Sequence, residues 1–180
     1  MLEVLPGTRI VEIVRDPRDV LCSKIKAEWS KRRPWWFHVF VSRAQLNYHG
    51  KVGNASHLVI YEQLLADPEK VMRDVCEFLE VEYSSAMLRH EVAAARLMRQ
   101  SESSWKRNTL QPILSDNVEN WRTQLSPFQA HFVESLTWSN PLIADNYQQA
   151  GRSMPLWQRV VCWAAVAASS VVQVAYRWKR

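Results

Sequence analysis

Glycine is scarce in this sequence, and its placement excludes a glycine-rich phosphate loop. The 180 residues contain four glycines, Gly7, Gly50, Gly53 and Gly151. A phosphate loop needs glycines for close backbone approach, followed by a lysine and a hydroxyl residue that open a helix. None of the four glycines stands in that context, and Gly50-Lys51-Val52-Gly53 is interpreted as a helix C-cap and turn. A nucleotide kinase, which needs its own phosphate loop, is therefore disfavoured.

Cysteine is also rare, and its pattern excludes a disulfide framework and a zinc site. Cys22, Cys76 and Cys162 are odd in number and widely spaced, without a CxxC pair. They are interpreted as reduced thiols, so we expect a cytoplasmic protein without a bound metal. Met1 to Gly7 is short and carries an acidic residue, and no signal peptide is expected.

The composition is that of a globular domain with a moderate positive charge. Hydrophobic residues make up 47% and charged residues 23% of the chain, which is long enough to form a hydrophobic core. The net charge of +5 favours anionic ligands or surfaces but identifies none of them.

Apolar runs alternate with amphipathic segments, which predicts an α/β fold with a parallel sheet flanked by helices. Asp67 and Pro68 are typical of the N-cap and first position of a helix, and Ser126 and Gln129 form a capping-box pattern. Residues 100–120 are polar and are expected to form loops. The expected strands lie near 9–15 and 58–61, and the expected helices lie near 17–30, 35–48, 68–80, 84–99 and from 126 onward.

The junction between the first strand and the first helix is the most informative segment. Asp16 suits the N-cap, and Pro17 suits the first helical position, which needs no N–H donor. Asp19 is expected to be the acidic partner of a capping box. These features describe a good helix start in any protein, but they leave two arginines, Arg15 and Arg18, unexplained.

An anion site is the second interpretation of this junction. Free backbone N–H groups and the positive end of the helix dipole meet there, and Arg15 can grip a phosphate with two parallel hydrogen bonds. Asp16, Asp19 and Ser23 follow helical spacing, so a hydroxyl on the same face can be a second phosphate donor. Both interpretations remain open at this point: a phosphate site, or a capped helix beside a surface arginine.

The residues Ile13 to Ser23 (Ile-Val-Arg-Asp-Pro-Arg-Asp-Val-Leu-Cys-Ser) resemble the sulfotransferase family, which uses 3'-phosphoadenosine 5'-phosphosulfate (PAPS). The resemblance implies that Arg15 and Ser23 hold the 3'-phosphate of the nucleotide. The segment 57–69 resembles the family's strand, Tyr-Glu and acidic-Pro helix start, which implies that Tyr61 lies near the adenine. The segment 117–122 resembles the family's Gly-Asp-Trp-Lys segment.

The sequence departs from the family at two places. The family has a phosphate-loop βα unit before the arginine-bearing strand, and this chain opens almost directly on that strand. The resemblance therefore implies a P-loop-NTPase-like sulfotransferase fold that is incomplete at the N-terminus. The family's Arg-Lys-Gly donors are replaced by Leu-Ser-Asp at 114–116, with Lys106 and Arg107 as weak substitutes. Trp121 is a weak candidate for the nucleotide site and is better interpreted as a packed residue.

The aromatic segment Trp35-Trp36-Phe37-His38 has two interpretations. It loosely resembles the family's helix that faces the acceptor pocket, which makes His38 a weak candidate for the catalytic base. The favoured interpretation is a Trp-Trp-Phe core cluster with His38 on the helix surface. The basic and aromatic mixture at 31–37 could also bind nucleic acid or a sulfated glycan, which remains a minor option.

The C-terminal segment is uncharged from Val160 to Tyr176, a run of 17 residues with basic residues on both sides. A span needs about 20 residues. The alternatives are a membrane span, a helix on the membrane surface, and a helix docked in a hydrophobic groove. The expected organisation is a partial sulfotransferase-like domain at 1–140, a linker at 141–155 and a hydrophobic helix at 156–180, which forms a possible membrane anchor.

The resemblance implies transfer of a sulfuryl group from PAPS to a hydroxyl or amine acceptor, such as a glycan or a lipid, without a metal. Catalysis would rest on in-line positioning and charge stabilisation. A phosphate-loop lysine and a general base are not identified, so the activity of this chain alone is in doubt. The alternative is a non-catalytic remnant that binds a membrane, a partner or a polyanion through its basic surface and C-terminal helix.

Overall fold

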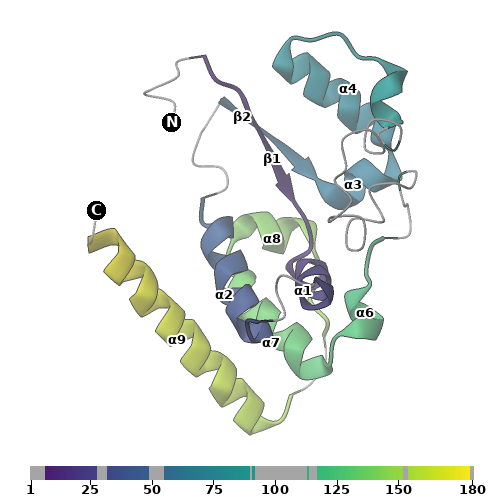
Figure 1. Ribbon diagram of the computed structural model, residues 1–180. Coiled ribbons are helices and arrows are strands. Elements are labelled where there is room, and N and C mark those ends of the chain that lie inside the picture. Colours follow the sequence, from purple (N-terminus) through teal and green to yellow (C-terminus); the bar gives the residue numbers. More distant parts are fainter. Residues whose placement is uncertain are drawn as a thin grey trace. The chain divides into compact units, whose positions relative to one another are not determined.

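The computed structural model describes residues 7–27, 32–48, 55–89, 91, 113, 117–151 and 154–178, with the backbone alone for 170–178 (Figure 1). Contacts divide the chain into two compact units. The sheet unit comprises Met1–Arg15 and Gly50–Val118, and the helical unit comprises Asp16–His49 and Glu119–Arg180. The chain thus leaves the sheet unit between Arg15 and Asp16, inside the motif that the sequence singled out.

Among its described residues, the sheet unit contains two parallel strands, β1 (Ile10–Val14) and β2 (Ser56–Ile60), which point the same way in Figure 1. Their register runs from Ile10 opposite Ser56 to Val14 opposite Ile60. Parallel strands need a long crossover connection, and here it contains α1 (Pro17–Lys26) and α2 (Trp35–Leu46). The predicted parallel α/β sheet is confirmed.

Helices α3 (Tyr61–Ala66) and α4 (Pro68–Leu79) follow β2 within the sheet unit. The sequence predicted α4 with its Asp67 cap, and the Asp67 carboxylate does accept the Lys70 backbone N–H at 3.1 Å. Helix α3 was not predicted, because the expected strand was extended to Tyr61. Arg9 ties β1 to the end of α4, since its Nη1 donates to the Phe78 carbonyl oxygen at 2.7 Å.

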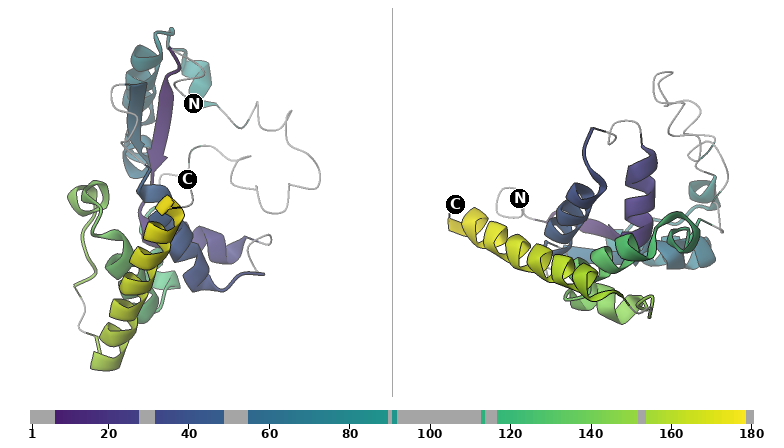
Figure 2. Two further views of the ribbon diagram at one scale, coloured as in Figure 1. Left: turned by 90° about the vertical axis from the view of Figure 1, so that its left-hand side faces the viewer. Right: turned by 90° about the horizontal axis from the view of Figure 1, so that it is seen from below.

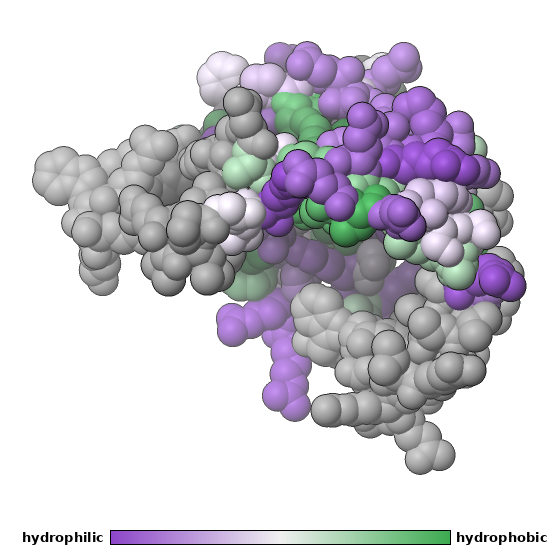
Figure 3. Space-filling view, turned by 90° about the horizontal axis from the view of Figure 1, so that it is seen from above, coloured by the Kyte–Doolittle hydropathy of each residue, from purple (hydrophilic) through white to green (hydrophobic). Residues whose placement is uncertain are grey.

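The small sheet leaves apolar side chains at its surface. Val14, Val59 and Ile60 are buried, whereas Ile13 and Leu58 are exposed. Figure 3 likewise shows hydrophobic side chains that reach the surface among hydrophilic ones. His57 stacks on Phe78 of α4 with ring centroids 5.3 Å apart, so α4 covers part of β2. A two-stranded sheet depends on such packing, because it is marginal by itself.

The helical unit contains α1 and α2 together with four later helices (Figures 1 and 2). The apolar side of α1 is formed by the buried Leu21 and Cys22, whereas Ile25 is exposed. The later helices are α6 (Trp121–Gln124), α7 (Pro127–Thr137), α8 (Pro141–Asn146) and α9 (Leu156–Trp178).

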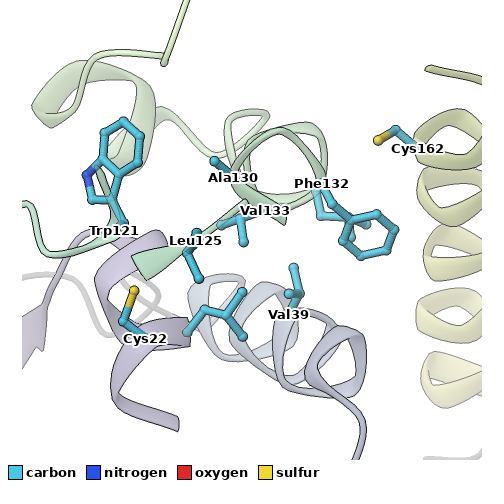
Figure 4. Close-up of a cluster of buried hydrophobic side chains, with 10 residues drawn as sticks. Cys22, Val39, Trp121, Leu125, Ala130, Phe132, Val133 and Cys162 are labelled. Carbon is cyan, nitrogen blue, oxygen red and sulfur yellow. The ribbon is translucent and has the colours of Figure 1, made fainter. Parts of the chain in front are cut away.

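A hydrophobic core joins these helices, and Figure 4 shows its side chains converging from α1, α2, α6, α7 and α9. Leu136 is completely buried, and Val133 beside it is nearly so. Trp35 packs edge-on against Phe132 at 5.1 Å between ring centroids, which confirms the core interpretation for this tryptophan. The cluster comprises Leu21, Cys22, Val39, Trp121, Leu125, Ala130, Phe132, Val133, Leu136 and Cys162.

Several expected elements fall differently in the structure. The helix expected over 84–99 is a short 3-10 helix, η3 (Ser85–Leu88), and most of the remainder lies outside the described residues. The segment expected to be a linker includes α8, whose N-cap Asn140 accepts the Leu142 N–H at 3.0 Å. The expected domain boundaries at 140 and 155 stay predictions. Within the part of the chain that the structure describes, no helix is long and apolar enough to cross a membrane.

The start of α7 gives a first testable prediction. The capping box is present as predicted, because Ser126 Oγ accepts the Gln129 N–H at 3.2 Å and Gln129 Oε1 accepts the Ser126 N–H at 2.9 Å. We expect Ser126→Ala to lower the free energy of unfolding by about 1 kcal/mol. Urea denaturation followed by circular dichroism measures the loss of unfolding free energy.

Ser23→Ala, at an exposed serine inside α1, is the control and should leave the urea midpoint unchanged. Equal midpoints for both variants would contradict this role of the cap.

Candidate functional site

Arg15 and Tyr61 are brought together by the register of the sheet. Val14 and Ile60 are the last opposed pair of β1 and β2, and Arg15 and Tyr61 are the residues that follow them. The guanidinium carbon of Arg15 lies 4.5 Å from the centroid of the Tyr61 ring. Two predicted site residues therefore meet at the carboxyl end of a parallel sheet, where open α/β folds place their ligands.

Asn117 completes a closed cluster with these two residues, all within the sheet unit. Arg15 Nη2 donates to the Asn117 carbonyl oxygen at 2.9 Å and to its Oδ1 at 3.4 Å. The Asn117 amide Nδ2 donates in turn to the Tyr61 hydroxyl at 3.0 Å. These hydrogen bonds and the ring contact hold the guanidinium in a defined orientation, which a forked grip on an anion requires.

The Arg15 cluster (Arg15, Tyr61 and Asn117) combines a permanent positive charge with an aromatic ring. All three residues are half-buried, so the cluster remains partly accessible. Arginine stays charged at every physiological pH, and its planar donors match the oxygens of a phosphate. A tyrosine ring beside it offers a face for a base or another flat group. The arrangement can therefore bind a small molecule that carries both an anion and an aromatic ring.

Arg18, the second arginine of the motif, lies inside the helical unit and is 2% exposed. Its guanidinium is bound on two sides, by Asp16 Oδ2 at 2.7 Å from Nη2 and by Glu134 Oε1 at 2.7 Å from Nη1. Glu134 Oε1 also accepts the Ala150 backbone N–H at 2.8 Å. Arg18 is thus a structural residue, which corrects the argument that both arginines at this junction point to an anion.

Aromatic rings complete the enclosure of Arg18. Its guanidinium carbon lies 3.8 Å from the Trp121 ring centroid and 4.7 Å from that of Trp138. Asp19 supports the same place, because its Oδ1 accepts the Trp121 backbone N–H at 2.9 Å. The sequence assigned Asp19 to a capping box, but the structure links it to α6, 102 residues along the chain. Only the Asp16 cap, which accepts the Arg18 N–H at 2.8 Å, is local as predicted.

The remaining predicted nucleotide-binding residues lie in different surroundings. Ser23 is exposed on α1 in the helical unit, and its joint role with Arg15 stays a prediction. Trp121 is 4% exposed and packed against Arg18, which agrees with its interpretation as a packed residue. Lys106 and Arg107 lie outside the described residues, so their role also stays a prediction.

His38, the weak candidate for a catalytic base, is buried in α2 at 5% exposure. Its expected place on the helix surface is therefore wrong. It is Trp36 that is exposed in this segment. A general base must come within hydrogen-bond reach of the proton that it removes, and the burial of the His38 ring gives an acceptor little access in this structure.

The three cysteines are free and buried. Burial raises the pKa of the Cys162 thiol above its ordinary value, and a hydrogen bond with Ser135 partly offsets this rise. The thiol is therefore protonated at neutral pH, and it is correspondingly unreactive. Among the described residues, no group of His, Cys, Asp and Glu side chains is arranged to hold a metal ion.

Asn117 is the site residue that sequence reasoning missed. The signal was available, since Asn117 begins the segment 117–122 that resembles the family, but no role was assigned to it. No sequence motif marks Glu134 and Trp138, the partners of Arg18. Their contacts depend on the return of the chain to α1 more than 110 residues later, which local pattern does not reveal.

A comparison with known protein families finds a match in the N-terminal part of the chain, which contains the Arg15 motif. Residues 1–85, a little under half of the sequence, match the sulfotransferase family. This stretch contains the segments 13–23 and 57–69, so their resemblance to the family is confirmed, and the roles of Arg15, Ser23 and Tyr61 stay predictions. The protein is therefore sulfotransferase-like in this region. A comparison with curated proteins finds no significant match.

Proposed function

We propose that the Arg15 cluster binds the 3'-phosphate and adenine of PAPS, as the nucleotide half-site of a sulfotransferase-like protein. The observation that carries the proposal is the contact between Arg15 and Tyr61 after the paired strand ends Val14 and Ile60. The resemblance implies these two roles for the same two residues, and residues 1–85 match the family. The resemblance implies Ser23 as the second phosphate donor, and Lys106 and Arg107 are weaker candidates, whereas the buried Trp121 is no longer proposed for the nucleotide site.

The proposed reaction transfers a sulfuryl group to a hydroxyl or amine acceptor, which can be a glycan or a lipid. The bond between sulfur and the bridging oxygen of the phosphosulfate breaks, and a bond from sulfur to the acceptor oxygen or nitrogen forms. The acceptor loses its proton to solvent water, and adenosine 3',5'-bisphosphate leaves with the bridging oxygen. Arg15 takes no part in the bond changes, and its proposed role is to hold the 3'-phosphate and so position the donor. We propose a cytoplasmic location, which the free cysteines support.

A comparison of two nucleotides tests the donor site on the full chain. We expect adenosine 3',5'-bisphosphate to bind at least about tenfold more tightly than adenosine 5'-monophosphate at low ionic strength, because only the first carries the 3'-phosphate for Arg15. Isothermal titration calorimetry measures both dissociation constants. Equal affinities, or no binding of either nucleotide, would reject the proposed half-site.

A second candidate is a non-catalytic remnant that binds a membrane, a partner or a polyanion. The observation that favours it is the exposed apolar surface of α9, where Leu156 and Trp163 are among the most exposed large hydrophobic residues. The two candidates are separated by incubating the chain with labelled PAPS and simple hydroxyl and amine acceptors. Release of adenosine 3',5'-bisphosphate together with a sulfated product supports the enzyme, and nucleotide binding without turnover supports a remnant.

A further inference from the structure

Helix α9 presents an apolar outer face to solvent. We define the outer face by residues that share helical spacing and are exposed: Leu156, Trp157, Val160, Val161, Trp163, Ala164, Ala167 and Ala168. Trp163 is 78% exposed and Leu156 is 74% exposed. Side chains at positions 156, 160, 163 and 167 form one stripe along the helix. The face contains no charged residue, and the indole N–H groups are its only side-chain hydrogen-bond donors.

The opposite face of α9 is already occupied. Cys162 and Ser169 are buried, and Ala165 and Val166 pack against the hydrophobic core of the helical unit. The Ser169 hydroxyl donates to the Val166 carbonyl oxygen at 2.7 Å, so this polar group is satisfied within the helix. The helix also packs beside α7 in Figures 1 and 2. Because the inner face of α9 packs on the helical unit, only the outer face is available to bind another surface.

The net positive charge of the protein comes from the C-terminal part of its sequence. Residues 146–180 contain five basic residues and no acidic residue, and the remaining 18 basic residues balance all 18 acidic ones. The segment therefore accounts for the whole net charge of +5. Arg159 lies exposed on α9, and Arg177, Lys179 and Arg180 follow the uncharged run. Basic residues around an apolar face attract the anionic headgroups of a lipid surface.

A lipid surface fits the outer face better than a protein does. Protein interfaces carry a hydrogen bond for every 100–200 Å² or so of buried area, and the outer face supplies only its indole N–H groups. Leucine, valine and alanine side chains match acyl chains, and tryptophans are enriched at the boundary between acyl chains and headgroups. Trp157, which also contacts Phe128 with ring centroids 6.0 Å apart, is held in place for such a role.

We propose that α9 lies flat on an anionic lipid bilayer, with its outer face in the boundary between headgroups and acyl chains and its inner face on the helical unit. The exposed Arg159 contacts the headgroups, and the net positive charge of the sequence 146–180 favours an anionic surface. This interaction is independent of the Arg15 cluster, which belongs to the sheet unit.

Vesicle flotation of the full chain tests the proposal. We expect the protein to float with phosphatidylcholine vesicles that contain phosphatidylserine, and to bind at least about tenfold less to vesicles of phosphatidylcholine alone. Trp163→Asp is expected to reduce binding to the anionic vesicles by about tenfold or more, because it places a charge in the apolar stripe. Trp36→Asp, at an exposed tryptophan of α2 in the same unit, is the matched control and should float like the unmodified protein.

Three results would overturn the proposal. The first is that the unmodified protein fails to float with anionic vesicles. The second is that Trp163→Asp and Trp36→Asp bind alike while circular dichroism shows both folded. The third is a concentration-dependent dimer that Trp163→Asp abolishes in the absence of vesicle binding, since a second copy would then cover the outer face.

Discussion

Replacing Arg18 with methionine is expected to lower the free energy of unfolding of the helical unit by about 3–5 kcal/mol. The substitution keeps a long side chain between Trp121 and Trp138 but leaves the carboxylates of Asp16 and Glu134 without their cation. Glu134 is itself 5% exposed, so water cannot replace the lost partner. Since a domain is stable by only about 5–15 kcal/mol in total, the variant should unfold at a much lower urea concentration.

Urea titration followed by circular dichroism measures this loss, and two variants locate its origin. Arg122→Met is the matched control, because Arg122 contacts the same indole, at 4.7 Å from the Trp121 centroid, but is exposed. It should leave the midpoint nearly unchanged. Glu134→Gln should fall between the two, because Asp16 still pairs with Arg18. If Arg18→Met and Arg122→Met unfold at the same midpoint, Arg18 does not have the structural role described here.

Replacing Arg15 with alanine is expected to weaken the binding of adenosine 3',5'-bisphosphate by about 100-fold while the protein stays folded. A hydrogen bond to a charged group contributes about 1.5–3 kcal/mol, and a forked arginine grip contains two. Arg15→Lys keeps the charge but loses the fork, so we expect an intermediate affinity. Adenosine 5'-monophosphate should be affected much less, because it lacks the 3'-phosphate.

Calorimetric titration of each variant measures these affinities, with Arg73→Ala as the matched control. Arg73 is also an arginine of the sheet unit above a tyrosine ring, with its guanidinium carbon 4.2 Å from the Tyr83 centroid, but it is exposed and outside the Arg15 cluster. It should bind the nucleotide like the unmodified protein. An Arg15→Ala variant that is folded and keeps its affinity would remove the basis for the nucleotide half-site.

The two arginines of Arg15-Asp16-Pro17-Arg18 thus lie in different surroundings, although they are three positions apart in one motif. Arg15 ends in a partly accessible cluster with Tyr61 and Asn117. Arg18 is enclosed by Asp16, Glu134 and two indoles. The two arginines differ because the chain passes from the sheet unit to the helical unit between Arg15 and Asp16, so each arginine belongs to a different unit. Substitutions at the two positions should therefore separate binding from stability.

Local patterns predicted the features that depend on neighbouring residues. The caps Asp16, Asp67 and Ser126 were predicted and confirmed, because each bonds a backbone N–H within three residues. The surface position predicted for His38 was wrong, because its side chain is buried. The bond from the Trp121 backbone N–H to Asp19 was not predicted, because the two residues are far apart in the sequence. Helix α3 was missed because Tyr61 continues an apolar strand pattern, and the pattern itself does not mark where the strand ends.

The sequence by itself determined the α/β class, the starts of α1, α4 and α7, and the sulfotransferase-like motif around Arg15, since these depend on patterns of neighbouring residues. The tertiary structure alone decided which arginine reaches a partly open site and which is buried, and it added Asn117 to the first. The reason is the separation of the partners. Asn117 lies 102 residues from Arg15, and Glu134 lies 116 residues from Arg18, so only folding brings their hydrogen-bonding groups into reach.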